Sequence, residues 1–363
     1  MSNQADQILD VLADRYASPA MCAIWSPRGK IIAERQLWLA LLRAQIKNGL
    51  EVPEGVMAAY AAAIMDVDLE SIAARERVNR HDVKARIEEF CAISGGHEFI
   101  HRGMTSRDLT DNVEQMQIRQ AMELVRDRVV ALLYLFSQKA LEHRDLAIAG
   151  RSHNQIGQIT TVGKRLANCG EELMYAYSAL DNLIHRYPLR GMKGAMGTGQ
   201  DMLDLLGGDT EAYEQVEDSI MQFLGFGTIF DNVGQVYPRS LDYDVASTLA
   251  LVASGPTNFA NLIRLMSGFN LASEGFKDGQ VGSTAMPHKM NTRTCERICG
   301  FNKIIHGYAT MLGQLAGDQW QEGDVSCSVV RRVGIADVFL ALDGLIESTM
   351  TVLLEMRVHP YVI

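Results

Sequence analysis

The sequence lacks several features that mark common classes of protein. No apolar run approaches the roughly 18 to 20 residues that span a bilayer, so we expect no transmembrane helix. The N-terminal residues contain no basic segment followed by an apolar block, which argues against a secretory signal and for a cytoplasmic location. With a net charge of −10, the 363-residue chain also lacks the basic balance of a nucleic-acid-binding protein.

Paired cysteines are also absent. The six cysteines are scattered, form no CxxC pair and have no matching histidine spacing, so neither a disulfide framework nor a zinc site is expected. The apolar fraction of 47% and the charged fraction of 21% are typical of a globular protein. The length suggests about two or three domains.

Proline is scarce, and helical periodicity dominates between the eight prolines. Between Gly103 and Gly150 the chain contains neither glycine nor proline, and apolar residues recur there at three- and four-residue steps. A continuous helix over residues 104–149 would be about 70 Å long. Further helices are expected over 160–187, 242–276 with a kink at Gly255-Pro256, 293–317 and 328–356. The expected fold is all-α, with a smaller N-terminal helical domain (1–106) followed by a long-helix bundle (107–357).

The segment Gly282-Ser-Thr-Ala-Met-Pro-His-Lys-Met-Asn291 is unlike a packed element. Its backbone N–H groups and hydroxyls are suited to surround an anion, and Lys289 adds a positive charge. An ordinary glycine- and serine-rich connection has a similar composition. We therefore interpret the segment as a candidate catalytic loop, with a plain loop as the alternative.

Two further strings combine polar side chains with a helix start. Thr105 and Asp108 have the spacing of a capping box, and their helix N-terminus is either only capped or also a site for a carboxylate or phosphate. The string Ser152–Arg165 is expected to form a short loop before a helix. It surrounds His153 with amides and hydroxyls, which makes proton transfer an alternative to a purely structural role.

These three strings, in their order along the chain, resemble the signatures of the fumarase/aspartase superfamily. The ending Thr160-Thr-Val-Gly-Lys-Arg165 resembles the adenylosuccinate lyase family within it. So do Arg15-Tyr-Ala-Ser-Pro19, Arg80-His-Asp-Val83 and Gly234-Gln-Val-Tyr-Pro-Arg239, which extend the resemblance over essentially the whole chain. By itself, Arg80-His81-Asp82 would be more typical of a surface ion pair on a helix.

The resemblance implies a β-elimination that releases fumarate from adenylosuccinate and from the succinyl-carboxamide ribotide of purine synthesis. It implies Ser283 as the general base, His153 as the general acid and no metal or organic cofactor. It also implies a homotetramer whose sites are shared between chains, a small nucleotide as substrate, and neither nucleic acid nor membrane as partner. The substrate-binding residues implied are Arg15, Tyr16, Arg80, His81, Asp82, Thr105, Ser106, Gln235, Lys289, Asn291, Arg297, Ser328 and Arg332, with His101 and Glu296 of second rank.

The chain departs from the family pattern in two places that matter. Gly323 stands where many relatives carry a substrate-contacting arginine. Residues 358–363 resemble the start of a C-terminal helical domain that is otherwise absent, so the expectation is either a truncated chain or a naturally shortened protein. The alternatives are another fumarate-releasing lyase, such as argininosuccinate lyase, and a non-catalytic helical scaffold.

Overall fold

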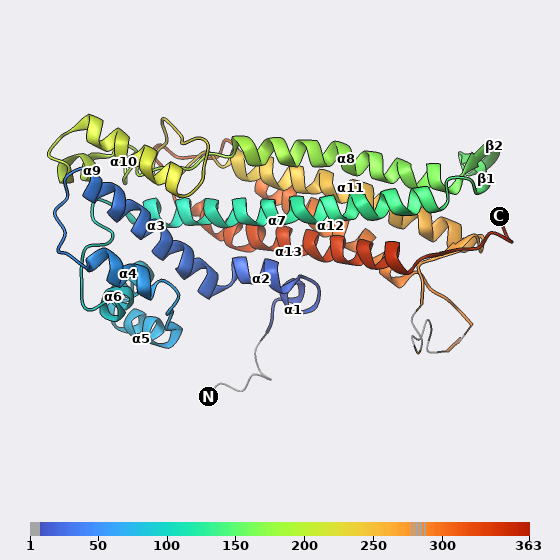
Figure 1. The fold of residues 1–363 in the computed structure, drawn as a ribbon, viewed down its shortest axis with the longest axis horizontal. Coiled ribbons are helices and arrows are strands. Elements are labelled where there is room, and N and C mark those ends of the chain that lie inside the picture. The colour runs from blue at the N-terminus through green and yellow to red at the C-terminus, as the bar shows by residue number, and fades with distance from the viewer. Residues whose placement is uncertain (1–7, 277–278, 280–282, 284, 287) are drawn as a thin grey trace.

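The computed structural model describes residues 8–276, 279, 283, 285–286 and 288–363. Within these residues the fold is predominantly helical, with two small two-stranded sheets. Five long helices run side by side along the longest axis of the molecule (Figure 1). They are α7 (Ser106–Glu142), α8 (Val162–Arg186), α11 (Ser240–Gly268), α12 (Arg293–Gly313) and α13 (Ser326–Glu355).

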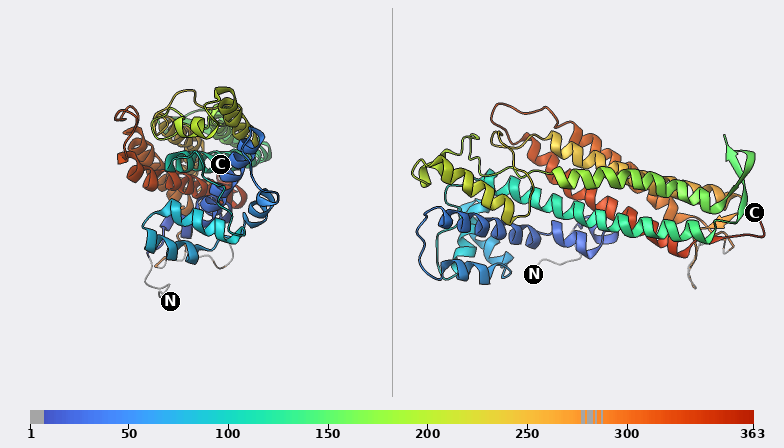
Figure 2. Two further views of the ribbon diagram at one scale, coloured as in Figure 1. Left: turned by 90° about the vertical axis from the view of Figure 1, so that its left-hand side faces the viewer. Right: turned by 45° about the horizontal axis from the view of Figure 1, so that its top comes forward.

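The other helices gather mainly toward one end of this bundle and along its side (Figures 1 and 2). They are α1 (Val11–Arg15), α2 (Pro19–Trp25), α3 (Pro27–Lys47), α4 (Val56–Ala63), α5 (Leu69–Asn79), α6 (Asp82–Ile93), α9 (Gln200–Leu205) and α10 (Thr210–Phe223). Helix α3 connects this group to the bundle, because it packs against both α7 and α10. None of the helices in the described part of the chain is both long and apolar enough to cross a membrane.

The apolar spacing of α7 produces the predicted buried face. Val113, Val125, Val129 and Leu132 are fully buried, as expected for one stripe of an amphipathic helix. The helix ends at Glu142, before the predicted end at residue 149. At about 1.5 Å per residue its 37 residues span about 55 Å rather than 70 Å.

The shortfall arises because residues 147–161 form an antiparallel hairpin, so the prediction of a loop before α8 was wrong. Strands β1 (Ala147–Ser152) and β2 (Gln155–Thr161) pair with Ala147 opposite Thr161 and Ser152 opposite Gln155. His153 and Asn154 form the turn with φ values of 51° and 60°, the left-handed conformation that two-residue hairpin turns require. At the same end, β3 (Ala272–Ser273) pairs with β4 (Arg357–Val358).

Helix α11 begins near the predicted position and continues through Pro256. The prediction that it reaches residue 276 was wrong, because it ends at Gly268 and Asn270 takes a left-handed conformation with φ of 57°. Helices α12 and α13 end within four residues of their predicted bounds.

Gly255 allows α11 and α8 to approach closely. A Cβ at this position would lie 2.9 Å from the Cys169 carbonyl oxygen and 3.0 Å from the Leu173 nitrogen, both in the backbone of α8. Backbone atoms cannot rotate away as a flexible side chain does, so the two helices would have to separate.

We therefore expect Gly255→Ala to lower the free energy of unfolding by about 1–3 kcal/mol, as overpacking typically does. Gly307→Ala in α12 is the matched control, because a Cβ there meets nothing within 4 Å. Since alanine favours a helix over glycine by up to about 1 kcal/mol, the control is neutral or stabilising. Thermal unfolding followed by circular dichroism measures both variants, and equal melting temperatures would contradict the close-approach argument.

His101 is held in a neutral state by its surroundings. The Trp38 indole N–H donates to His101 Nδ1 over 3.1 Å, so Nδ1 carries no proton. Burial, and to a smaller extent the charge of His81, lowers the pKa of His101 to about 4. The unfolded chain therefore binds a proton at this residue at a higher pH than the folded chain does.

The contribution of neutral His101 to stability is consequently complete above about pH 6.5 and is lost as the pH falls toward 4. At pH 5 the loss is on the order of 2 kcal/mol. In His101→Gln the amide oxygen still accepts from Trp38 but does not titrate. We expect the melting temperature of the wild type to fall more steeply between pH 7 and pH 5 than that of the variant; parallel pH profiles would remove His101 as a source of acid sensitivity.

Candidate active site

The first turn of α7 is fixed by a buried carboxylate. Thr105 and Asp108 form the predicted capping box, in which the Thr105 N–H donates to Asp108 Oδ2 over 2.8 Å. The Asp108 side chain also pairs with the buried Arg190 guanidinium and accepts from the Gly194 N–H over 3.0 Å. The helix start is therefore tied to the glycine-rich loop that follows α8.

A polar pocket of about 150 Å³ opens beside this helix start. It brings together four of the predicted substrate-binding residues, and these come from three helices. They are Asp82 of α6, Ser106 of α7, and Ser328 and Arg332 of α13. The Arg107 guanidinium, which also lines the pocket, donates to Ser328 Oγ over 2.7 Å and so links α7 to α13.

The charges around this pocket favour an anion. Lys30 and Arg332 line it, and the positive charge of Lys30 acts to lower the pKa of both Glu34 and Asp82. Partial burial acts to raise the pKa of Asp82, but the guanidinium of Arg86 outweighs it and holds this pKa below its ordinary value. Arg86 in turn contacts the fully buried carboxylate of Glu34 over 2.6 Å. Asp82 is thus held as a carboxylate. The four cations of the lining outnumber its two carboxylates, Asp82 and Glu114, so the net charge of the pocket favours an anion.

Arg331, which also lines the pocket, joins three segments of the chain. Its Nε donates to Asp242 Oδ2 over 2.7 Å, and its terminal nitrogens contact Glu114 and the Tyr237 hydroxyl. Tyr237 donates onward to Asp242 Oδ1 over 2.7 Å. The sequence reasoning missed Lys30, Arg107 and Arg331, although Arg107 lies inside one recognised string and Arg331 precedes a predicted residue.

Gln235 lies in a separate cavity of about 190 Å³ together with Gly323. The Gln235 N–H donates to the Glu322 carbonyl over 2.6 Å. Gly323 has a φ of 150°, and a Cβ there would lie 3.3 Å from Gln235 Cβ. The backbone at this position therefore suits glycine, so restoring an arginine would require the loop to change conformation.

Arg15, Tyr16 and Arg297 form a third group. The Arg15 and Arg297 guanidinium carbons lie 6.0 Å and 5.6 Å from the Tyr16 ring centroid, and Tyr16 packs edge-on against Phe301. Two cations thus share one aromatic ring, an arrangement suited to an anionic group. The neighbouring Glu296 is exposed on the first turn of α12.

Of the Arg80-His81-Asp82 string, only Asp82 lines the polar pocket. Arg80 ends α5 in a left-handed conformation, and His81 caps α6 by accepting the Lys84 N–H at Nδ1 over 3.3 Å. His81 Nδ1 lies 3.8 Å from an Asp82 carboxylate oxygen, with both side chains about half exposed. His101 faces Trp38 rather than this pocket.

His153 occupies the exposed turn of the hairpin. The expectation that neighbouring amides and hydroxyls would fix its tautomer is not met within this chain, because the described residues give its ring no hydrogen-bond partner.

The candidate catalytic loop is anchored at α12. Glu274 is buried, and its carboxylate accepts from the Thr294 and Cys295 N–H groups at the start of that helix. Ser283 Oγ accepts the Met286 N–H over 3.2 Å, and the Lys289 N–H donates to the Met286 carbonyl. Lys289 is exposed and Asn291 is partly buried. Gly282, Thr284 and Pro287 of the motif lie outside the described residues.

The recognised strings are thus distributed along the bundle. The hairpin with His153 and the start of α12 lie at one end, whereas the starts of α7 and α13 lie toward the other (Figure 1). A single chain therefore does not bring His153 to the polar pocket. Among the described residues, no three His, Cys, Asp or Glu side chains gather closely enough to hold a metal ion.

Comparison with known proteins assigns the family. The sequence profile of the family described as "Lyase" matches residues 15–307. The adenylosuccinate lyases of Saccharomyces cerevisiae and Schizosaccharomyces pombe are each 32% identical to this chain, covering 99% and 97% of it and 75% and 74% of the relatives.

Solved structures confirm the fold. The 3-carboxy-cis,cis-muconate lactonizing enzyme from Pseudomonas putida superposes with a TM-score of 0.83 at 23% identity, over 97% of this chain and 78% of that one. A fumarate lyase from Mesorhizobium sp. BNC1 gives 0.79 at 22% identity, over 95% and 77%. On sequence and fold together, this chain belongs to the fumarase/aspartase superfamily of lyases and is a homologue of the adenylosuccinate lyases.

Proposed function

We propose that this protein is an adenylosuccinate lyase, which releases fumarate from adenylosuccinate and from the succinyl-carboxamide ribotide of purine synthesis. The similarity to adenylosuccinate lyases across nearly the whole chain carries the proposal. The polar pocket supports it, because Ser106 and Ser328 converge there beside the cations Lys30 and Arg332.

In the proposed reaction, Ser283 removes a proton from the carbon next to a succinyl carboxylate. The electron pair of that C–H bond forms the C=C bond of fumarate, and the C–N bond breaks. His153 donates a proton to the departing nitrogen. Serine is a weak base unless its anion is stabilised, and the Met286 N–H that points at Ser283 Oγ, together with Lys289, supports this role.

The other residues are assigned to the two ends of the substrate. Arg15, Tyr16 and the Arg80-His81-Asp82 set bind the nucleotide end, while Thr105, Ser106, Lys289 and Asn291 bind the succinyl carboxylates. Gln235, Arg297, Ser328 and Arg332 complete the site. Two cations over Tyr16 suit the nucleotide phosphate.

We propose a homotetramer in which each site draws on several chains. Large apolar side chains lie exposed on several bundle helices, including Tyr134 of α7, Tyr175 of α8 and Val329 of α13, with exposed fractions of 63%, 73% and 68%. Ile159 of the hairpin is 83% exposed. Exposed apolar side chains on several neighbouring helices are typical of surfaces that become buried between the subunits of a symmetric assembly. Such packing allows His153 of one chain to reach the pocket of another.

Fumarate release tests the proposed substrate. The purified chain is mixed separately with adenylosuccinate, the succinyl-carboxamide ribotide and argininosuccinate, and the absorbance of the product is followed. We expect turnover of the first two only. Cleavage of argininosuccinate without cleavage of adenylosuccinate would replace this proposal with an argininosuccinate lyase.

Replacement of the base tests the mechanism. We expect Ser283→Ala to lower kcat for adenylosuccinate by about 10²–10⁴-fold, the usual contribution of general acid–base catalysis, while KM changes little. Ser137→Ala, which removes an exposed hydroxyl on α7, is the control and retains full turnover. A Ser283→Ala variant with near-normal kcat would remove Ser283 from the base role.

A further inference from the structure

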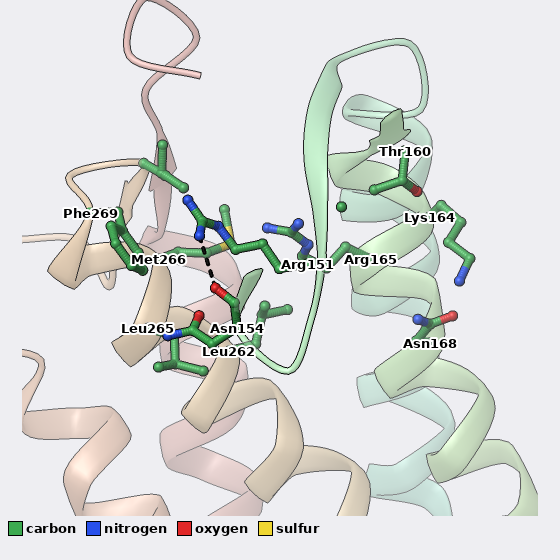
Figure 3. Close-up of a pocket in the computed structure, with 12 residues that line it drawn as sticks. Arg151, Asn154, Thr160, Lys164, Arg165, Asn168, Leu262, Leu265, Met266 and Phe269 are labelled. Atoms are coloured by element: carbon green, nitrogen blue, oxygen red, sulfur yellow. Dashed lines mark hydrogen bonds between the residues drawn. The ribbon is translucent and has the colours of Figure 1, made fainter. Parts of the chain in front are cut away.

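A further cavity lies outside the polar pocket. It has a volume of about 610 Å³, within the roughly 300–1,000 Å³ that is usual for small-molecule sites. It lies between the β1–β2 hairpin, the first turns of α8 and the end of α11 (Figure 3). Neither Ser283 nor any residue of the polar pocket lines it.

One side of this cavity is cationic. Arg151 of β1 and Arg165 of α8 extend into the space between the hairpin and the helices, and Lys164 lines the α8 side (Figure 3). Arg151 and Arg165 donate only to backbone carbonyls, those of Asn154 and Ala149. Within the described residues, none of the three cations pairs with a carboxylate.

Arg151 and Arg165 destabilise each other's charge. Burial, followed by the like charge of Arg151, lowers the pKa of Arg165. An arginine nevertheless stays protonated in a protein, so both charges remain and repel each other. An anion between them would relieve this repulsion and accept charge-assisted hydrogen bonds from both.

The opposite side is apolar. This wall is formed by three side chains of α11 and by the residue that follows its last turn. They are Leu262, Leu265 and Met266, followed by Phe269. Leu265 and Phe269 are 58% and 45% exposed, although both are large and apolar. The Arg151 guanidinium carbon lies 4.6 Å from the Phe269 ring centroid, so the two walls meet at this pair.

We infer that this cavity binds a small amphipathic anion. Its sulfonate, phosphate or carboxylate group lies between Arg151 and Arg165, and its aromatic or aliphatic body lies on Leu265 and Phe269. The chemistry of the two walls favours such a ligand over a purely polar anion, which would leave the apolar wall wet. The inference does not rest on the proposed function, because neither Ser283 nor His153 lines the cavity.

Titration with 8-anilinonaphthalene-1-sulfonate tests the site, because this probe combines an aromatic body with a sulfonate and fluoresces on transfer to an apolar surface. The test variant is Arg151→Gln/Arg165→Gln. Arg144→Gln is the matched control, because it removes a cation that is 70% exposed outside the cavity. We expect the double variant to weaken Kd at least tenfold and the control to leave it unchanged.

Leu265→Asn tests the apolar wall and is also expected to weaken Kd about tenfold. Thermal unfolding confirms that each variant is folded. If the double variant does not fold, Lys164→Gln replaces it, with an expected weakening of about threefold for an exposed charge.

Equal Kd values for the wild type and the folded cavity variants would overturn the inference. A wild type that does not bind the probe would also overturn it, as happens if a second chain covers the cavity. The titration contains no lyase substrate. Its outcome is therefore separate from the fate of the proposed function.

Discussion

The buried ion pair between Asp108 and Arg190 joins the start of α7, beside the polar pocket, to the loop that follows α8. Removing one partner of such a pair typically costs about 3–5 kcal/mol, because the other charge is left buried without compensation. Asp108 also receives the Thr105 and Gly194 N–H groups, so the orientation of the α7 start depends on it. One and two turns further along, Asp111 and Glu114 meet Arg239 and Arg331. Each of these three carboxylates thus contacts a different distant segment, and together they hold the segments around the polar pocket.

The length of the bundle is the second constraint. Helices α7 and α13 begin toward one end and the hairpin lies at the other, so His153 and the polar pocket of one chain stay apart (Figure 1). A rigid bundle cannot fold back to join them. The exposed apolar side chains on α7, α8 and α13 provide the surface on which another chain would pack. Under the proposed function, assembly therefore completes the site.

The sequence predicted the long helices well, because residues such as Val125, Val129 and Leu132 are buried at helical spacing. It did not predict the hairpin, since Ile156 and Ile159 are both exposed and no apolar face marks β2. The family resemblance pointed to Ser106, Ser328 and Arg332, but Lys30 joins them only through the packing of α3. Single-chain periodicity carries no information on such contacts, nor on which chain supplies a residue to a shared site.

The shared site is tested most directly by mixing two inactive variants, His153→Gln and Ser283→Ala, and measuring fumarate release after subunit exchange has been confirmed by mass. If the two residues of one site come from different chains, random exchange leaves both intact in about a quarter of the sites. The account predicts recovery of about a quarter of wild-type turnover. Complete subunit exchange with no recovery of turnover would contradict it.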